Sequence, residues 1–223
     1  MRRVYVGKTK DVFAMDDGRI LLQFKDAVTG ADGIIDAGAN QVIGEVAGKG
    51  SSSFRLTLYF FELLKKAGVA THFVGEGSVP NSMIVMPARS YGLEVICRER
   101  AWGSFVRRYG KYVQEGAPLP SLVEFTIKDD DRGDPLINSE AVAALGIASR
   151  EAVEHMTKAA KEMTALIKAD LAEKGLELID IKFEFGEIEG RTVLIDEVSG
   201  DSMRVVRDGK VLLQNELAEA VLG

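Results

Sequence analysis

The residues best suited to chemistry lie on one predicted strand near the carboxyl end of the chain. In the segment 180–185, Ile and Phe alternate with Asp180, Lys182 and Glu184. Because successive side chains of a strand point to opposite faces, one face is apolar and the other carries acid, base and acid. Further charged side chains follow closely: Asp196, Glu197, Asp201 and Arg204. Carboxylates and cations gathered on a half-buried strand indicate a site for a metal ion and a phosphate.

A hairpin over residues 177–198 is predicted to carry two of these carboxylates, and its register decides whether they meet. A two-residue turn places Asp196 opposite Phe183, on the wrong face for Glu184. A three-residue loop, or a bulge at Gly186, places Asp196 directly across from Glu184. We favour the second register because only it brings the carboxylates together, where they would suit Mg²⁺. The alternative is a solvated strand face with cross-strand ion pairs.

A second motif, Gly-Lys-Thr-Lys at 7–10, lies at the tip of a predicted hairpin. Gly7 lets the backbone approach a phosphate, and Lys8 and Lys10 neutralise its charge. The motif is not a P-loop, which needs a longer glycine-framed loop between a strand and a helix. An ordinary turn with exposed lysines is the alternative interpretation.

A third motif, residues 98–104, ends a strand with two arginines and continues into a Gly-Ser step at a predicted helix start. Guanidinium groups bind phosphate in a bidentate manner, and helix N-terminal amides favour anions. The motif therefore indicates either an anion pocket or a surface turn with two ion-paired arginines. The acidic turn that contains Asp134 is, from its pattern alone, better explained as a loop.

Composition limits the class of protein. The 223 residues carry a net charge of −6, which argues against nucleic acid as a partner. No apolar run reaches the roughly 18 residues of a membrane span, and the opening residues enter a strand pattern, so we expect neither a membrane protein nor a signal peptide. The single cysteine, Cys97, favours a reducing cytoplasm and is predicted to be a buried, inert thiol. The isolated His72 and His155 are predicted to be structural.

Hydrophobic periodicity predicts a strand-rich first part and a mixed second part, with a boundary near 85–92. Strands are expected at 4–6, 12–15, 20–25, 71–74, 83–86, 93–98, 122–128 and around 205, besides the hairpin at 177–198. Helices are expected at 51–67, 101–109, 138–146 and 149–175 and from 215 onwards. Serines 51–53, Asn138 and Ser149 are expected to cap three of them. The glycine-rich residues 26–50 are predicted to form a long loop.

Taken in order, segments along the whole chain resemble the SAICAR synthetase family of purine biosynthesis. The matching pieces are YVGKTKDVF at 5–13, GKG at 48–50, GVATHFV at 68–74, LEVICRERAWGS at 93–104, GDPLIN at 133–138, LIDIKFEFG at 178–186 and IDEVSGDSMR at 195–204. The ordered set, rather than any single motif, carries the resemblance.

The resemblance implies an α+β fold of two lobes. An antiparallel N-terminal β lobe, related to the protein-kinase small lobe and containing one helix, would span residues 1–88. It would pack on a C-terminal α/β lobe of residues 89–223, with ATP in the cleft. The implied activity joins 5-amino-1-(5-phospho-D-ribosyl)imidazole-4-carboxylate (CAIR) to L-aspartate through an acyl phosphate, giving SAICAR, ADP and phosphate with Mg²⁺. The family also suggests a homodimer.

The family's site residues transfer to this chain by motif position. The nucleotide would be bound by Gly7, Lys8, Thr9 and Lys10 over its phosphates and by Pro87, Ala88 and Ser90 near its adenine. The Mg²⁺ ion would be held by Glu184 and Asp196. The catalytic residues would be Lys182, Asp180 and Asp201. The substrates would be bound by Arg98, Ser104, Lys128, Asp134 and Arg204.

Two departures from the family pattern concern these positions. Trp102 stands where Ala is usual, so a large ring must fit near the phosphate pocket. Gly200 replaces the Pro of the common Ser-Pro-Asp, a change that is expected to loosen the loop that carries Asp201. Two other functions stay open: a small-molecule kinase, which needs no aspartate, and a nucleotide-binding regulatory protein without catalysis.

Overall fold

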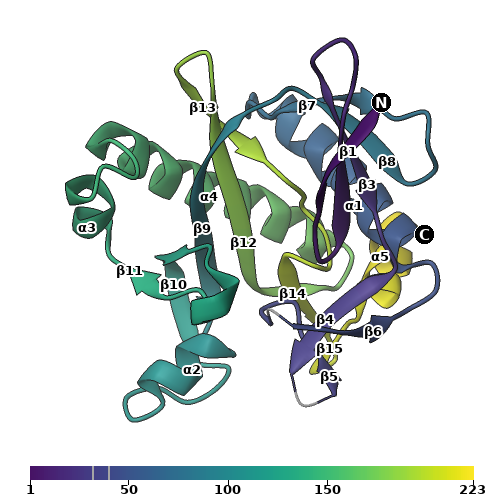
Figure 1. The fold of residues 1–223 in the computed structure, drawn as a ribbon. Coiled ribbons are helices and arrows are strands. Elements are labelled where there is room, and N and C mark those ends of the chain that lie inside the picture. Colours follow the sequence, from purple (N-terminus) through teal and green to yellow (C-terminus); the bar gives the residue numbers. More distant parts are fainter. Residues whose placement is uncertain (32, 40) are drawn as a thin grey trace.

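The computed structural model describes residues 1–31, 33–39 and 41–223, which form three antiparallel sheets surrounded by helices (Figure 1). Every pairing between the named strands is antiparallel. The long helix that covers the largest sheet completes an α+β architecture. The predicted fold class and the antiparallel N-terminal strands are therefore confirmed.

The N-terminal sheet contains five of the described strands. In order across the sheet they are β1 (Arg2–Val6), β2 (Lys10–Ala14), β3 (Ile20–Phe24), β8 (Ser82–Val85) and β7 (Phe73–Glu76). The first two form the predicted hairpin around residues 7–10. Helix α1 (Lys49–Lys66) packs its apolar side against β3 and also contacts the later helices.

Residues 26–50 do not form the predicted long loop, so that prediction is wrong. They contain a three-stranded sheet, ordered β5 (Ile34–Ile35), β4 (Ala27–Ala31) and β6 (Gln41–Glu45). The β-branched side chains of this segment supply strand propensity that its glycines hide from a pattern-based prediction. Positions 32 and 40 lie outside the described residues.

The start of α1 also differs from the prediction. The helix begins at Lys49, and its N-terminal amides are not capped by the serines at 51–53. Instead the Asp26 carboxylate accepts hydrogen bonds from the backbone N–H groups of Gly48 at 3.2 Å and Gly50 at 2.8 Å. An anion from the β3–β4 turn thus satisfies the positive end of the helix.

The seven-stranded sheet is centred on β9 (Arg89–Arg100) and β12 (Glu177–Ile188). Beyond β9 lie β10 (Pro118–Ile127) and β11 (Leu136–Ile137). The other edge of β12 pairs with β14 (Met203–Arg207), which is followed by β15 (Lys210–Val211), and with β13 (Arg191–Ile195). Helix α4 (Arg150–Glu173) covers the apolar face of this sheet (Figure 1). The predicted alternation along 180–185 is confirmed, because its apolar side chains join the core and its charged ones line a cavity.

The register of the β12–β13 hairpin is not the one that we favoured. Ile195, not Asp196, pairs with Glu184. The hairpin closes through a two-residue turn in which Glu189 and Gly190 have φ angles of 50° and 75°, a backbone shape that fits the twist of paired strands. Strand β13 ends at Ile195, and Asp196 follows with a left-handed φ of 65°. This change of backbone direction, rather than strand alternation, sets where the Asp196 carboxylate points.

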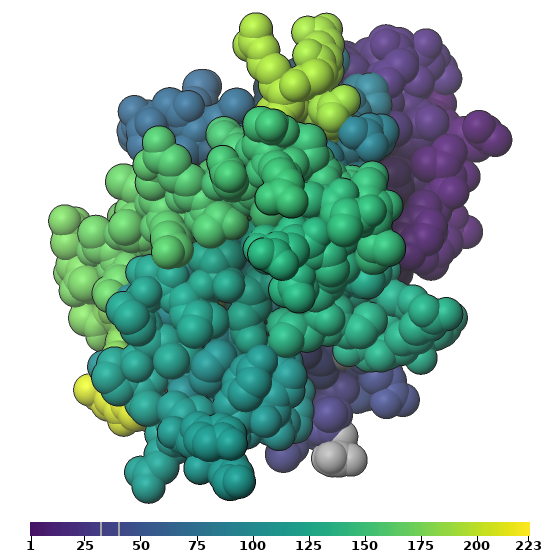
Figure 2. Space-filling model, turned by 90° about the vertical axis from the view of Figure 1, so that its left-hand side faces the viewer, coloured from purple at the N-terminus to yellow at the C-terminus, as the bar shows by residue number. Residues whose placement is uncertain are grey.

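Shorter helices flank the larger elements. They are α2 (Ser104–Tyr109), the 3-10 turn η1 (Asp130–Arg132), α3 (Ser139–Ala144) and α5 (Gln214–Leu222). In the face shown in Figure 2, the segment after α2 (teal) and the tip of the β12–β13 hairpin (yellow-green) project at opposite ends. Two predicted caps are confirmed: Asn138 Oδ1 accepts from the Ala141 N–H at 2.8 Å, and Ser149 Oγ accepts from the Ala152 N–H at 3.1 Å.

Replacing Ser149 with Ala is expected to lower the free energy of unfolding by about 1 kcal/mol, because the Ala152 amide loses its acceptor. Ser149→Asp keeps a side-chain acceptor and an N-terminal negative charge, so it should unfold near the wild-type midpoint. Urea denaturation compares the three proteins. Equal stability of Ser149→Ala and wild type would show that this cap contributes nothing.

One continuous cluster of buried apolar side chains joins the two predicted lobes. It contains Phe24 and Phe60 from the first part of the chain together with Met156, Phe183 and Leu217 from the second. The division between residues 88 and 89 therefore stays a prediction.

In the described part of the chain, no helix is both long enough and apolar enough to cross a membrane.

Candidate active site

A cavity of about 730 Å³ collects charged residues from distant parts of the chain. Its wall includes the 7–10 hairpin, residues 36–39, parts of β9, β10 and β12, and the loop that follows β13. The predicted site residues that line it are Gly7, Lys8, Thr9, Lys10, Arg98, Ser104, Lys128, Asp134, Asp180, Lys182, Glu184, Asp196, Asp201 and Arg204. All three sheets thus contribute to one charged cavity.

Pro87, Ala88 and Ser90 are the predicted site residues that do not line this cavity. Pro87 and Ala88 connect β8 to β9, and Ser90 is the second residue of β9; Pro87 and Ser90 are exposed whereas Ala88 is half-buried. The segment joins the N-terminal sheet to the seven-stranded sheet. Its backbone therefore lies at the junction of the two sheets rather than among the charged side chains.

Lysines and carboxylates alternate in space along one wall of the cavity. Lys128 Nζ lies 2.6 Å from Glu184 Oε1 and 2.8 Å from Glu184 Oε2. Lys182 Nζ lies 2.9 Å from Glu94 Oε1 and 3.9 Å from Glu184 Oε1. Glu94 is buried and also accepts a hydrogen bond from the Thr126 hydroxyl at 2.8 Å. We call Lys128, Lys182, Glu94 and Glu184 the lysine–carboxylate wall.

The Lys10 ammonium extends this charged network from the N-terminal hairpin. It lies 3.0 Å from Asp196 Oδ1 and also pairs with the Glu197 carboxylate. Burial alone would lower the pKa of Lys10, but the two carboxylates outweigh it and raise the pKa well above its ordinary value. Lys182 behaves in the same way: burial would lower its pKa, but the neighbouring carboxylates, Glu94 first, raise it well above its ordinary value. Both lysines are therefore fixed as cations near neutral pH.

Asp196 is the matching permanent anion. Burial would raise the pKa of its carboxyl, but Lys10, Lys128 and Lys182 lower it far below the ordinary range. The Asp196 carbonyl oxygen lies 3.3 Å from Nε2 of His72. Burial lowers the pKa of His72 to about 4, so its ring is neutral near pH 7 and packs edge-on against Phe61. His72 therefore has a structural role here, as predicted.

Two arginines form a second centre in the cavity, around Asp180. The Arg98 Nη1 and Arg204 Nη1 atoms each lie 2.8 Å from Asp180 Oδ2. Arg98 also donates to Glu124 Oε2 at 2.7 Å and to the Ser104 hydroxyl at 3.0 Å. Only 2% of the Arg98 side chain is exposed. The predicted phosphate ligands Arg98, Ser104 and Arg204 are thus brought to one spot, with Asp180 between the guanidinium groups.

Asp201 is held from several directions. Its Oδ2 lies 2.5 Å from Nζ of the fully buried Lys49 and accepts from the Ser53 hydroxyl at 2.9 Å. Its Oδ1 accepts from the Gln214 side-chain amide at 3.2 Å. At Gly200, an added Cβ would lie 3.0 Å from two Gln214 atoms, so the residue that replaces the family's proline lets α5 approach closely. The loop carrying Asp201 is therefore tied to both α1 and α5.

The acidic turn reaches the same cavity. Lys8 Nζ lies 2.6 Å from Asp130 Oδ1, which links the N-terminal hairpin to η1. Asp134 has a left-handed φ of 48°, and its Oδ1 accepts from the Asp129 N–H at 2.7 Å. The turn is structured by its own acids and still lines the cavity with Asp130 and Asp134. The pattern alone favoured a plain loop, and only the resemblance pointed to Asp134.

The sequence prediction missed several residues of the cavity and several partners of its residues. Asp36, Glu94 and Glu197 line the cavity, and Lys49 and Glu124 bond Asp201 and Arg98 from outside it. Glu197 was noted beside Asp196, and Lys49 falls in the quoted GKG motif, so a weak signal existed for these two. Asp36 lies in the segment that was read as a loop, and no local pattern marked it.

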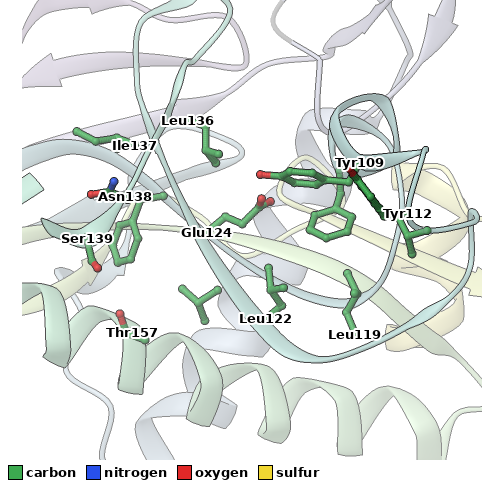
Figure 3. Close-up of a pocket in the computed structure, with 14 residues that line it drawn as sticks. Tyr109, Tyr112, Leu119, Leu122, Glu124, Leu136, Ile137, Asn138, Ser139 and Thr157 are labelled. Atoms are coloured by element: carbon green, nitrogen blue, oxygen red, sulfur yellow. The ribbon is translucent and has the colours of Figure 1, made fainter. Parts of the chain in front are cut away.

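A second cavity, of about 670 Å³, has a different lining. Figure 3 shows Tyr109, Tyr112, Leu119, Leu122, Leu136 and Ile137 around it, with Thr157 of α4 at one side. Glu124 is shared between the two regions: it lines this apolar cavity, and its carboxylate bonds Arg98 and Arg108 of the charged one. The described residues around the apolar cavity include no lysine, whereas Lys8, Lys10, Lys128 and Lys182 line the charged one.

Within the described residues, no group of three or more His, Cys, Asp or Glu side chains is arranged to hold a metal ion. Mg²⁺, however, is commonly held by one or two carboxylates together with the phosphates of a nucleotide. Glu184 and Asp196 supply hard oxygen donors on one cavity, although not as the cross-strand pair that we predicted. Their donor chemistry therefore fits Mg²⁺ only when phosphate oxygens complete the ligand set.

Comparison with known proteins identifies relatives along nearly the whole chain. The family model for SAICAR synthetase matches residues 3–217. The phosphoribosylaminoimidazole-succinocarboxamide synthase of Clostridium tetani is 45% identical over 226 residues, which covers 100% of both chains. That of Thermotoga petrophila is 41% identical over 208 residues, which covers 93% of this chain and 86% of the relative.

Solved structures agree with these matches. A SAICAR synthetase (type 2) in complex with ADP is 33% identical, with a TM-score of 0.86 over 98% of this chain and 94% of its own. A type-1 structure of SAICAR synthetase from Pyrococcus horikoshii is 31% identical, with a TM-score of 0.82 over 95% of this chain and 93% of its own. The chain therefore belongs to the SAICAR synthetase family.

Proposed function

We propose that this protein ligates CAIR to L-aspartate at the expense of ATP, producing SAICAR, ADP and phosphate in purine biosynthesis. The observation that carries the proposal is the single cavity in which the lysine–carboxylate wall lies beside the paired arginines Arg98 and Arg204. Such a cavity suits two phosphate-bearing substrates at once. Family membership and the ADP complex of a relative support ATP as the nucleotide.

The nucleotide is assigned to the side of the cavity formed by the first hairpin. Gly7, Lys8, Thr9 and Lys10 would lie over the ATP phosphates, and the segment containing Pro87, Ala88 and Ser90 would meet the adenine. Glu184 and Asp196 would hold Mg²⁺ with the phosphate oxygens. When bound, the ion would neutralise charge on the transferred phosphoryl group. Lys10 and Lys182, which stay protonated near neutral pH, would add fixed positive charge at the same place.

The ribonucleotide is assigned to the opposite side, with its phosphate near Arg98, Ser104 and Arg204. Lys128 and Asp134 line the space between the two sides and are proposed to contact the reacting part of the substrates. This arrangement would place the CAIR carboxylate between its own phosphate site and the γ-phosphate of ATP. Holding two anions together needs the lysines that the cavity supplies.

The proposed chemistry has two steps. The CAIR carboxylate attacks the γ-phosphorus of ATP, the bond to the β-phosphate oxygen breaks, and ADP leaves an acyl phosphate. The neutral amine of aspartate then attacks the acyl carbon, the bond from that carbon to the phosphate oxygen breaks, and the proton lost by the amine is taken up by the departing phosphate. Lys182, half-buried beside Glu94 and Glu184, is proposed to stabilise the negative charge that develops in both steps.

Asp180 and Asp201 are proposed to orient the site. Both oxygens of Asp180 accept from Arg204, and one also accepts from Arg98. Both oxygens of Asp201 are bonded, by Lys49, Ser53 and Gln214. Both oxygens of each carboxylate thus already accept hydrogen bonds from side chains of the protein. Their catalytic contribution would therefore be to hold Arg98, Arg204 and the 196–204 loop in place.

A coupled ADP-release assay with CAIR, with and without L-aspartate, tests the proposed function. A ligase is expected to release ADP and form SAICAR steadily only when both substrates are present. A small-molecule kinase would release ADP steadily without aspartate, and a regulatory protein would bind ATP without substrate-dependent release. Either of those results would overturn the proposal.

Homodimer formation, a cytoplasmic location and the absence of nucleic-acid and membrane partners are proposed with the function.

A further inference from the structure

Every nitrogen of the two paired guanidinium groups is already bonded within the protein. In Arg98, Nε donates to Glu124, Nη1 to Asp180 and Nη2 to Ser104. In Arg204, Nη1 donates to Asp180, while Nε lies 2.9 Å and Nη2 2.7 Å from Oδ1 of Asp36. An incoming phosphate can therefore take the bidentate Nε–Nη2 edge of Arg204 only if the Asp36 carboxylate there gives way.

The three carboxylates differ in how firmly they are held. The Asp180 side chain is 4% exposed and shared by both arginines, and the Glu124 side chain is 8% exposed and bonded by Arg98 and Arg108. The Asp36 side chain is 28% exposed, and its Oδ1 pairs with Arg204 and accepts from the Gly38 N–H at 3.1 Å. Breaking an exposed ion pair costs less free energy than breaking a buried one, because water solvates the charges that are separated. Asp36 is therefore the partner most readily displaced.

Access to Arg204 points to the same edge. A Cβ added at Gly38 would lie 2.1 Å from Arg204 Nη2, and one added at Gly103 would lie 3.0 Å from it. Backbone thus packs closely against the guanidinium at both glycines and leaves no room for a ligand atom there. The edge bonded to Asp180 is buried. A ligand oxygen reaches Arg204 by taking the position of the Asp36 carboxylate.

We infer that Asp36 determines the affinity of the ribonucleotide-phosphate site by occupying the Nε–Nη2 edge of Arg204 until the substrate phosphate displaces it. This inference rests on the proposed function only for the identity of the ribonucleotide. The Asp36 backbone is anchored to β4, where its N–H donates to the Thr29 carbonyl at 3.0 Å. Displacement is therefore a rotation of one side chain and not an opening of the whole segment.

Charge balance explains why this contact matters. Arg98, Arg108 and Arg204 face Asp36, Glu124 and Asp180, so the cluster is close to neutral while Asp36 is in place. Once Asp36 rotates away, the arginines carry one excess positive charge at a largely buried site. A phosphate dianion is then strongly favoured over weaker anions, which makes Asp36 a residue that determines specificity.

The test measures binding of inorganic phosphate and of ribose 5-phosphate, without ATP or aspartate. Calorimetry gives the dissociation constants, and the fluorescence of Trp102, the single tryptophan and the neighbour of Gly103, gives a second readout. Asp36→Asn and Asp36→Ala should each lower the dissociation constant by about tenfold, because the competing charge is gone. Glu45→Gln, which removes the same charge from an exposed position on β6, should leave it unchanged.

The opposite result would overturn the inference. If Asp36 instead holds Arg204 in its binding position, both Asp36 variants bind the probes more weakly than wild type or no better. A wild-type protein that binds neither probe also contradicts it. Failure of the proposed ligase function would be seen separately, as phosphate binding that responds to Asp36 in a protein that releases no ADP with CAIR and aspartate.

Discussion

Replacing Asp196 with Asn is expected to lower the rate of ADP formation by about 10²- to 10³-fold. The substitution removes one negative charge that faces Lys10, Lys128 and Lys182 and takes away a hard oxygen anion proposed to hold Mg²⁺. Lys10 would lose one of its two carboxylate partners, and Glu184 would be the one protein carboxylate left to hold the metal. A coupled assay of ADP release at saturating substrates measures the effect.

The fold should survive this change. Asp196 has a left-handed φ of 65°, a conformation that Asn adopts more readily than most residues. Lys10 keeps its pairing with Glu197, so no buried cation is left alone. The midpoint of urea unfolding should therefore stay close to that of wild type, which separates a loss of chemistry from a loss of structure.

Asp208→Asn is the matched control for Asp196→Asn. Asp208 also has a positive φ, of 51°, but it lies in the exposed turn between β14 and β15. The same chemical change at the same kind of backbone should leave ADP formation unaltered. If Asp196→Asn works at the wild-type rate, the metal assignment is wrong; if both variants lose activity equally, the effect is not specific to the cavity.

Local signals in the sequence predicted much of the fold. The alternation along 180–185 located the charged face of β12, and Asn138 and Ser149 marked two helix starts. These features depend on residues within one turn or one strand, so a single sequence is enough to detect them. The loop prediction for residues 26–50 was wrong because glycines in paired strands give the same local signal as glycines in a loop.

The hairpin register shows a different limit. The turn at Glu189 and Gly190 is a local signal for the observed register, whereas the expected convergence of Glu184 with Asp196 favours the other one. The structure brings both carboxylates to one cavity through the left-handed backbone at Asp196, after pairing has ended. The backbone conformation at Asp196 therefore directs its carboxylate, and the spacing of side chains in a sequence does not predict such a conformation.

The partners of the site residues were the least predictable. Arg204 meets Asp36, and Asp201 meets Lys49, across long separations in sequence. Each contact depends on how the three-stranded sheet and α1 dock against the seven-stranded sheet. Predicting them requires the tertiary arrangement, because neither residue pair leaves a pattern in its own segment.

Lys49→Met is expected to lower the free energy of unfolding by about 3–5 kcal/mol, the range found when one partner of a buried ion pair is removed. The Lys49 side chain is completely buried, and its Nζ lies 2.5 Å from Asp201 Oδ2 and 3.3 Å from the Lys25 carbonyl oxygen. Methionine fills a similar volume, so the loss comes from an Asp201 charge left without its cation. Equilibrium unfolding in urea at pH 7 measures it.

A double variant separates this explanation from simple loss of packing. In Lys49→Met with Asp201→Asn, the uncompensated charge is gone while Ser53 and Gln214 can still bond the amide. The double variant should therefore be more stable than Lys49→Met alone, with a coupling energy of about 1–3 kcal/mol. Additive losses would show that Lys49 stabilises the protein by packing rather than through Asp201.

Lys158→Met provides the exposed counterpart to Lys49→Met. Lys158 pairs with Glu162 at 3.8 Å on α4, and the two side chains are 77% and 63% exposed. Water can solvate the remaining carboxylate, so the expected loss is below about 1 kcal/mol. A small loss at Lys158 beside a large one at Lys49 would show that burial, not ion pairing as such, makes Asp201 dependent on α1. The position of the 196–204 loop, and with it Asp196 and Arg204, would then depend on a lysine that never contacts a substrate.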